Sequence, residues 1–205
     1  MSRLELSGVS DGALRLAAGR FDPACTVVSG DDASALAALA AVMSGVAPAR
    51  GQALLDGKPL SAWPPARRRV ASVLAREALP PAESVGRAVT RVLAARGDER
   101  RANDVLEPFG LGAWSSKRSV ALDHDELRSV ALALALTHAA ADLFVLYEPA
   151  SSSLDRVLVR ERIAAAVTRG AVVVLVSANT AVAESFGGPH AAVVGGVLQT
   201  SVVAA

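Results

Sequence analysis

Three short runs of apolar residues constrain the fold of this chain most strongly. They span Cys25–Ser29 (CTVVS), Leu143–Leu146 (LFVL) and Ala171–Val176 (AVVVLV), and none of them contains a charged residue. Uninterrupted apolar runs of this length are typical of strands that are buried on both faces of a sheet. Helical stretches separate the runs along the chain. The pattern therefore predicts an α/β fold, with a mainly parallel sheet flanked by helices.

The remaining segments extend this pattern. Further strands are expected at Gln52–Leu55, Val70–Leu74, Ala191–Val194 and Val197–Gln199. Helices are expected at Ser34–Met43, Ser84–Arg96, Arg100–Phe109, Glu126–Ala139 and Leu154–Val167. The stretch 80–120 is mainly helical and more charged, so it is interpreted as a small helical subdomain inserted into the fold. The core then comprises residues 1–79 and 121–205.

Composition sets further bounds. The chain has 205 residues, and the hydrophobic 52% of them can form the large core of one domain, with or without a subdomain. A net charge of +1, from 21 basic and 20 acidic residues, gives no general attraction to nucleic acid, so no such partner is expected. The single cysteine, Cys25, fits a reducing compartment. The histidines lie far apart and lack zinc-site spacing, so no metal is expected: His124, His138 and His190.

The chain offers no strong candidate for a membrane span. The nearest candidate, residues 33–49, carries no charge, but it contains Ser34, Ser44, Gly45 and Pro48 and is shorter than the roughly 20 apolar residues that a span needs. No secretory signal is recognised at the N-terminus. We therefore expect a cytoplasmic protein without direct membrane insertion, and any link to a membrane would come through a partner.

The segment Val27–Gly57 has the layout of a phosphate-binding strand, loop and helix followed by a hairpin. A working loop reads G-x-x-x-x-G-K-[ST], because backbone N–H groups close on the phosphates, a lysine supplies charge and a hydroxyl binds magnesium. The aligned residues retain only the first glycine: Gly30, Asp31, Asp32, Ala33, Ser34, Ala35, Leu36 and Ala37. The layout suggests a nucleotide-binding ancestor, whereas two carboxylates at the mouth of the site argue against binding a polyanion.

The order of segments resembles the ATP-binding subunits of ABC transporters over nearly the whole chain. Besides the phosphate loop, the resemblance is carried by residues 51–60 (GQALLDGKPL), 130–155 (VALALALTHAAADLFVLYEPASSSLD), 172–180 (VVVLVSANT) and 193–201 (VVGGVLQTS). The resemblance implies a P-loop NTPase-like fold with a helical subdomain. It also implies two kinds of partner, a membrane permease or a competent ATPase subunit.

The resemblance places Tyr147 where the family has the Walker B aspartate that orders magnesium, and Glu148 where it has the catalytic glutamate. A phenol, with an ordinary pKa of about 10, cannot replace a carboxylate in a magnesium shell at neutral pH. Glu148 could still polarise a water molecule. It is interpreted as a vestigial carboxylate at a strand end, because a base without the lysine, the metal and a closed phosphate loop has nothing to act on.

The other family landmarks are also altered. The signature Leu-Ser-Gly-Gly-Gln corresponds to Leu122–Glu126 (LDHDE), whose acids can cap a helix, with Asp123 as N-cap, and can also repel a phosphate. The switch histidine corresponds to Ala178, and the glutamine of the Q-loop falls within Ala75–Glu77. The D-loop segment Ser151–Asp155 is one residue longer than the family spacing.

These replacements predict a degenerate member, a pseudo-ATPase that acts as a binding, regulatory or structural subunit, for example of a membrane transporter. No catalytic residue and no cofactor are expected, and a partner would hold the protein at the inner face of the membrane. The alternative is an ATP-binding subunit that retains weak binding of ATP and magnesium, or that works in an asymmetric dimer with a competent ATPase. Because acids on the loop and the signature helix would face each other, the family's sandwich homodimer is not expected.

Two further features stay open. The triplet Arg67–Arg69 follows two prolines and precedes a strand, and it is interpreted as a solvated edge. Trp63 and Trp114 lie in polar contexts, where each can be an interface anchor or can pack under a loop.

Overall fold

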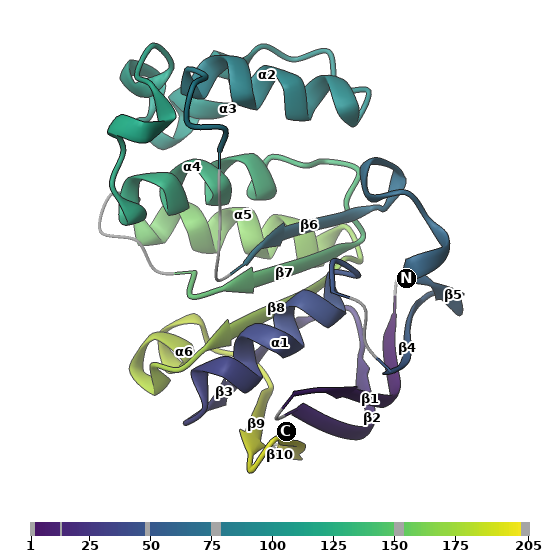
Figure 1. Ribbon diagram of the computed structural model, residues 1–205. Coiled ribbons are helices and arrows are strands. Elements are labelled where there is room, and N and C mark those ends of the chain that lie inside the picture. The colour runs from purple at the N-terminus through teal and green to yellow at the C-terminus, as the bar shows by residue number, and fades with distance from the viewer. Residues whose placement is uncertain (1–2, 13, 48–49, 75–78, 150–153, 202–205) are drawn as a thin grey trace.

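The computed structural model describes residues 3–12, 14–47, 50–74, 79–149 and 154–201. Within these residues the strands form two sheets (Figure 1). One has six strands in the order β10-β9-β3-β8-β7-β6, and the other has four in the order β2-β1-β4-β5. The predicted α/β fold, a mainly parallel sheet flanked by helices, is confirmed.

The six-stranded sheet contains the apolar runs recognised in the sequence. Its strands are β3 (Cys25–Gly30), β6 (Val70–Val73), β7 (Leu143–Tyr147), β8 (Val172–Ser177), β9 (His190–Val194) and β10 (Val197–Ser201). All neighbouring pairs are parallel except β9 and β10, which form the closing hairpin. Every residue of β7 and β8 is buried, which explains why these strands carry apolar residues on both faces.

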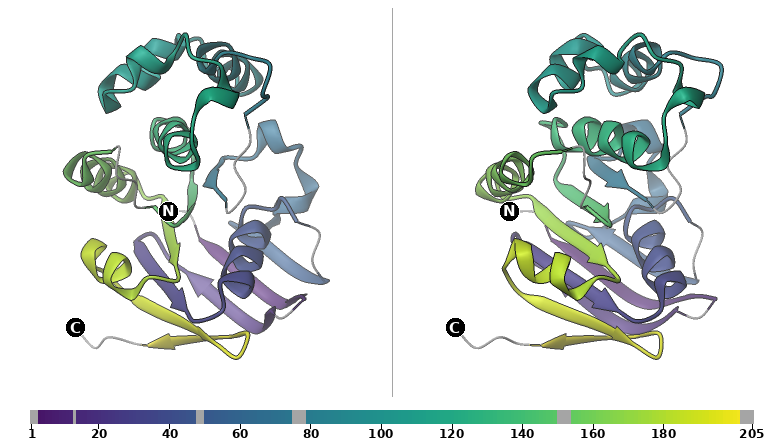
Figure 2. Two further views of the ribbon diagram at one scale, coloured as in Figure 1. Left: turned by 60° about the vertical axis from the view of Figure 1, so that its left-hand side comes forward. Right: turned by 90° about the vertical axis from the view of Figure 1, so that its left-hand side faces the viewer.

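Helices cover both faces of this sheet (Figure 2). Helix α1 (Ala33–Met43) packs on one face, in a hydrophobic cluster that includes Val172, Val174 and Val176. Helices α4 (His124–Leu136) and α5 (Arg156–Thr168) contribute to the cluster on the other face. Both α4 and α5 start as their N-caps dictate, since the side chains of Asp123 and Asp155 each accept a backbone N–H of the first turn.

The four-stranded antiparallel sheet was only partly expected. Its strands are β1 (Leu4–Asp11), β2 (Leu14–Phe21), β4 (Arg50–Leu55) and β5 (Lys58–Pro59). The sequence analysis expected a hairpin here and the strand Gln52–Leu55, but it did not identify β1, β2 or β5 as strands. The register of β1 against β4 shifts between Ser7 and Ser10, so the alternation of buried Leu4 and Leu6 is interrupted before Val9.

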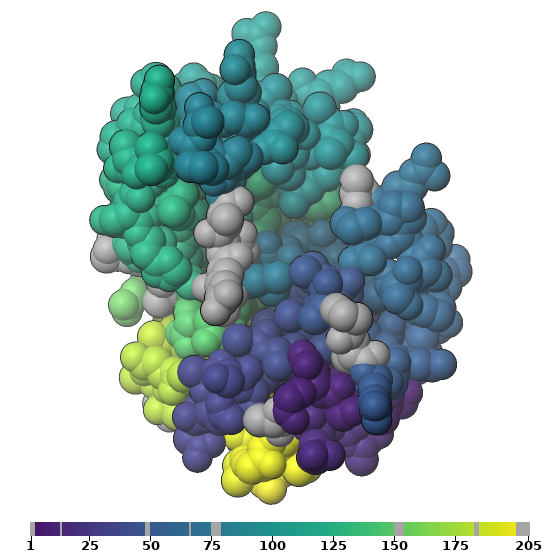
Figure 3. Space-filling model, in the orientation of Figure 1, coloured from purple at the N-terminus to yellow at the C-terminus, as the bar shows by residue number. Residues whose placement is uncertain are grey.

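The stretch expected to form a helical subdomain, residues 80–120, contains α2 (Val85–Ala95), α3 (Ala102–Leu106) and 3₁₀ turns. The helix expected at Arg100–Phe109 is shorter, because its last turn, Glu107–Phe109, is a 3₁₀ helix with Pro108 inside it. Figure 3 shows this stretch as the teal upper part of the molecule. Helix α6 (Thr180–Phe186) was not expected, although Asn179 accepts N–H groups from its first turn.

Candidate functional site

The loop segment Gly30–Ala37 lies where β3 ends and α1 begins, at the carboxyl edge of the parallel sheet. Ligands of open α/β sheets bind at this edge, where strand ends and helix N-termini meet. The structure therefore brings the loop segment to the expected place. What the segment can bind depends on where its side chains point.

The carboxylate of Asp32 covers the N-terminus of α1. Its Oδ1 accepts hydrogen bonds from the backbone N–H of Ser34, at 2.8 Å, and of Ala35, at 3.1 Å. First-turn N–H groups of this kind bind the phosphate in a working loop. Here an anion of the chain itself binds them. Asp31 lies beside this cap and is exposed, so it adds negative charge at the entrance.

Three other positions of the loop segment, Gly30, Ala35 and Leu36, are used for packing, whereas Ala33 and Ser34 are exposed. A Cβ on Gly30 would lie 2.6 Å from the carbonyl oxygen of Val193, so the close approach of β9 requires glycine here. Leu36, at the lysine position, is fully buried, and Ala35, at the position of the second glycine, is 1% exposed. The position that would supply the phosphate-binding charge therefore faces the hydrophobic core.

Tyr147 ends β7 and is also buried. Its side chain belongs to the same hydrophobic cluster as Leu36, on the α1 face of the sheet. Burial raises the pKa of the Tyr147 phenol, and the negative charge of Glu148 raises it further. The phenol is therefore neutral at physiological pH and cannot serve as a magnesium ligand.

Glu148 connects two strands. Its Oε2 accepts a hydrogen bond from Ser177 Oγ and its Oε1 accepts one from the backbone N–H of Ala178, both at 2.7 Å. Its own N–H donates to the carbonyl oxygen of Val176, at 2.7 Å. The backbone at Glu148 has a φ of 47°, in the left-handed region that non-glycine residues seldom adopt. Both carboxylate oxygens thus hold the ends of β7 and β8 together.

Arg128, on α4, completes this arrangement, and the sequence analysis did not single it out. Its Nη1 donates to the carbonyl oxygens of Tyr147, at 2.6 Å, and Glu148, at 3.3 Å, and its Nη2 lies 3.2 Å from His124 Nε2. The residue is 7% exposed. In the sequence, Arg128 stands out only as a charged residue next to the apolar residues of α4. The guanidinium supports the turn in which Glu148 has its unusual conformation.

The signature-like segment forms a capped helix start. Asp123 Oδ1 accepts the N–H of Glu126 at 2.8 Å, and Glu126 Oε2 accepts the N–H of Asp123 at 3.0 Å. The predicted capping box is confirmed. Lys117 Nζ lies 3.4 Å from Glu126 Oε1. The first-turn N–H of Glu126, which a glycine-rich signature would leave free for a phosphate, already has an acceptor in the chain.

The remaining landmarks divide into two groups. Ala178 is exposed, and its N–H is bound by Glu148 as described above. The Q-loop segment Ala75–Glu77 and the serines of the D-loop segment, 151–153, lie outside the described residues.

The described residues do not fit ATP and magnesium. The anion site at α1 is covered by Asp32, the lysine position is buried as Leu36, and the magnesium carboxylate is replaced by Tyr147. In the described part of the chain no group of three or more acidic, histidine or cysteine residues could hold a metal ion. None of the helices in that part reaches the length and apolar character needed to cross a membrane.

Comparison with known proteins supports the fold assignment. No protein-family model and no curated protein matches the sequence. One similar solved structure is described as the ATP-binding subunit of an ABC transporter, with a TM-score of 0.79, 19% identity and coverage of 96% of this chain and 89% of that one. Another is a putative ABC transporter ATP-binding protein from Pyrococcus furiosus, with a TM-score of 0.64, 17% identity and coverage of 85% and 90%. The chain thus has the fold of the ABC ATP-binding subunits.

Proposed function

We propose that this protein is a pseudo-ATPase: a chain with the fold of an ABC ATP-binding subunit that acts as a binding, regulatory or structural subunit and does not turn over ATP. Its partner is a membrane permease or a competent ATPase subunit. It works in the cytoplasm or, through that partner, at the inner face of the membrane.

One observation carries the proposal: the groups that would contact ATP are bound to the chain itself. Asp32 accepts the first-turn N–H groups of α1, and Glu148 accepts hydrogen bonds from Ser177 and Ala178. A triphosphate would have to displace one carboxylate and pass a second, Asp31. At a surface-like dielectric, each like-charge contact at about 4 Å costs about 1–4 kcal/mol.

Titration calorimetry with ATP and magnesium tests the proposal. We expect no saturable heat of binding up to millimolar ATP. A dissociation constant in the millimolar range corresponds to a binding free energy of only about −4 kcal/mol. A matched variant, Asp31→Asn with Asp32→Asn, keeps an N-cap but removes both charges. It should also fail to bind, because Leu36 and Tyr147 still leave the phosphates and the metal without partners.

A dissociation constant in the micromolar range for the unmodified chain would overturn this proposal. It would favour the alternative, an ATP-binding subunit with residual nucleotide binding or a role in an asymmetric dimer. Micromolar binding by the double variant alone would mean that the two acids, and not the buried positions, account for the loss.

A further inference from the structure

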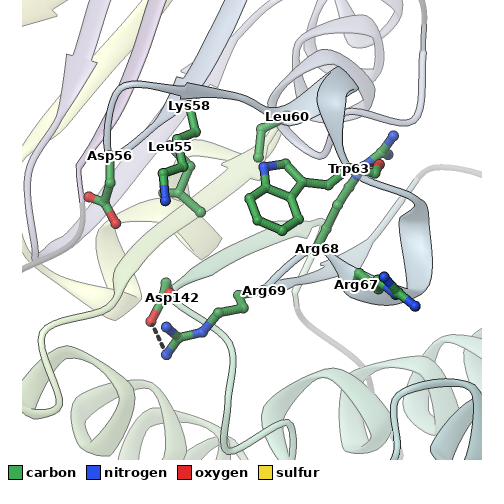
Figure 4. A pocket seen from close by; sticks show the side chains of 9 residues that line it. All are labelled: Leu55, Asp56, Lys58, Leu60, Trp63, Arg67, Arg68, Arg69 and Asp142. Atoms are coloured by element: carbon green, nitrogen blue, oxygen red, sulfur yellow. Dashed lines mark hydrogen bonds and ion pairs between the residues drawn. The ribbon is translucent and has the colours of Figure 1, made fainter.

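A cavity lies at the edge of the parallel sheet opposite to the loop segment. Figure 4 shows the side chains that line it. The cavity is bounded by the β4–β5 hairpin and by residues that directly precede two strands: Arg69 precedes β6, and Asp142 precedes β7. The cavity encloses about 270 Å³. Pockets for drug-sized ligands are usually larger, about 300–1,000 Å³, so this one suits a smaller molecule.

The lining of the cavity carries more positive than negative charge. It contains two acidic residues, Asp56 and Asp142, and four basic ones, Lys58, Arg67, Arg68 and Arg69. The sequence analysis interpreted the arginine triplet as a solvated edge. Arg67 and Arg69 are exposed, as that interpretation expects, and all three arginines also line this cavity.

Both acids already have partners. Asp142 Oδ1 lies 2.8 Å from Arg69 Nη2, and Asp56 Oδ1 accepts the backbone N–H of Arg3 at 2.8 Å. Among the described residues, Lys58 and Arg67 have no carboxylate partner. Figure 4 shows the Arg67 side chain directed away from Trp63, so the cavity offers chiefly the ammonium of Lys58 to an anionic ligand.

The cavity also has an aromatic wall. Trp63 is 41% exposed, and Lys58 Nζ lies 5.8 Å from the centre of its ring. Figure 4 shows the indole beside Leu60, with the Lys58 ammonium and the Arg69 side chain at its open side. Leu60 is 3% exposed and supplies an apolar floor. A planar ring can stack on an accessible indole, and the stacking stabilises the complex in addition to the burial of apolar area.

We propose that this cavity binds a small aromatic acid, a molecule with one planar ring and one carboxylate or phosphate group. The ring stacks on Trp63, and the anionic group pairs with Lys58. The volume is too small for a molecule of the size of a nucleoside triphosphate. This site is independent of the proposed function, because none of its lining residues belongs to the loop segment or to the Glu148 turn.

The fluorescence of Trp63 gives a direct assay. The chain has two tryptophans, so Trp114→Phe leaves Trp63 as the only indole. Phenyl phosphate is the probe, and benzyl alcohol and inorganic phosphate test the ring and the anion separately. We expect a saturable change with phenyl phosphate, and binding of each comparator at least about tenfold weaker, because each makes only one of the two contacts.

Substitutions measured by calorimetry in the otherwise unmodified chain complete the test. Lys58→Met should weaken phenyl phosphate binding by about tenfold, the effect of losing one charge-assisted contact. Lys117→Met is the matched control: it removes the same charge beside the other tryptophan, with Nζ 5.2 Å from the Trp114 ring centre, outside the cavity. It should change affinity by less than about twofold.

Trp63→Ala, at a partly exposed position, should reduce binding to the level of inorganic phosphate. The proposal is overturned if phenyl phosphate gives no saturable signal at 10 mM, if inorganic phosphate or benzyl alcohol binds as well as phenyl phosphate, or if Lys58→Met and Lys117→Met behave alike. None of these outcomes bears on ATP binding, so the two proposals can fail separately.

Discussion

Ser177 Oγ donates a 2.7 Å hydrogen bond to the carboxylate of Glu148, and this bond joins the ends of two adjacent parallel strands, β7 and β8. The second carboxylate oxygen accepts the N–H of Ala178, the position that corresponds to the switch histidine. In an active site of this fold, a glutamate at this position would have to face water and phosphate. Here its hydrogen-bonding capacity serves the connection between strands.

The first prediction concerns the left-handed backbone at Glu148. Glu148→Ala should lower the free energy of unfolding by about 2–3 kcal/mol, because it leaves the N–H of Ala178 and the Ser177 hydroxyl without their acceptor. Glu148→Gly loses the same bonds but suits a φ of 47°, so it should be about 1 kcal/mol more stable than the alanine variant. Urea denaturation measures both values. Equal stabilities would show that the turn carries no strain.

The second prediction concerns the cap of α1. Asp32→Ala should destabilise the protein by about 0.5–2 kcal/mol, because the N–H groups of Ser34 and Ala35 lose their acceptor. Asp32→Asn retains an acceptor oxygen and should lower the free energy of unfolding by only a few tenths of a kcal/mol, about the difference between two good N-cap residues. If alanine and asparagine were equally tolerated in urea denaturation, the carboxylate would not be acting as a cap.

The third prediction concerns restoration of the loop. Leu36→Lys with Ala37→Ser rebuilds two residues of the family motif but should not create an ATPase, since Asp32 and Tyr147 remain. Leu36 is fully buried, so an ammonium there should destabilise the chain by about 3 kcal/mol or more, whereas Leu36→Met should cost less than about 1.5 kcal/mol. A phosphate-release assay and urea denaturation measure the two effects. Magnesium-dependent hydrolysis above background would contradict the account of the site.

The fourth prediction concerns acid stability through His138. Burial, and then the positive charge of Arg96, lower the pKa of His138 from 6.5 to about 4 in the folded chain. The unfolded chain therefore binds more protons between these values, and the free energy of unfolding falls as the pH drops through that window. Because the ring is partly exposed, we expect a loss of about 2 kcal/mol between pH 7 and pH 4.

A neutral substitute at this position isolates the effect. Between pH 7 and pH 4, the free energy of unfolding of His138→Gln should fall by about 2 kcal/mol less than that of the unmodified chain, since other groups titrate equally in both proteins. Urea denaturation at pH 7.0 and 4.0 gives the comparison. Identical pH dependence in the two proteins would exclude His138 as the cause.

The fifth prediction concerns association. In the family's sandwich arrangement, the loop acids Asp31 and Asp32 would face the acids at the start of α4, and like charges at about 4–6 Å cost about 1 kcal/mol or more per pair. The chain should therefore not form that homodimer, with or without ATP. Cysteines at Ser34 and Val120, both exposed, leave every acid in place and should not link one chain to another through a short bismaleimide. An efficient cross-link between these two positions would refute the electrostatic argument.

The parts of the fold that follow from local pattern were predictable. The charge-free runs identified β3, β7 and β8, and the Asp123–Glu126 spacing identified the start of α4. Strand β1 was missed because the register shift in its pairing with β4 interrupts its alternation. Strand β2 was missed because its alternation of buried Leu14 and Leu16 stops at exposed Ala17 and Ala18.

The sequence located the residues of the candidate site but did not predict their contacts. The absent lysine and the absent magnesium carboxylate can be read directly at Leu36 and Tyr147. The contacts of Glu148 with Ser177, and of Arg128 with Tyr147, join residues 19 or more positions apart. Such contacts depend on the order of strands in the sheet, which the sequence does not state.

The order of strands in the six-stranded sheet also governs how the chain can fold during synthesis. Strand β8 lies between β3 and β7, so neither of these earlier strands can join the other until Val172–Ser177 has been made. A nascent chain must therefore carry β3 with unpaired edges through most of translation, and unpaired strand edges favour aggregation. A premature stop before Val172 would leave β3 without either of its neighbours, β8 and β9, and of the six-stranded sheet only β6 and β7 could still pair.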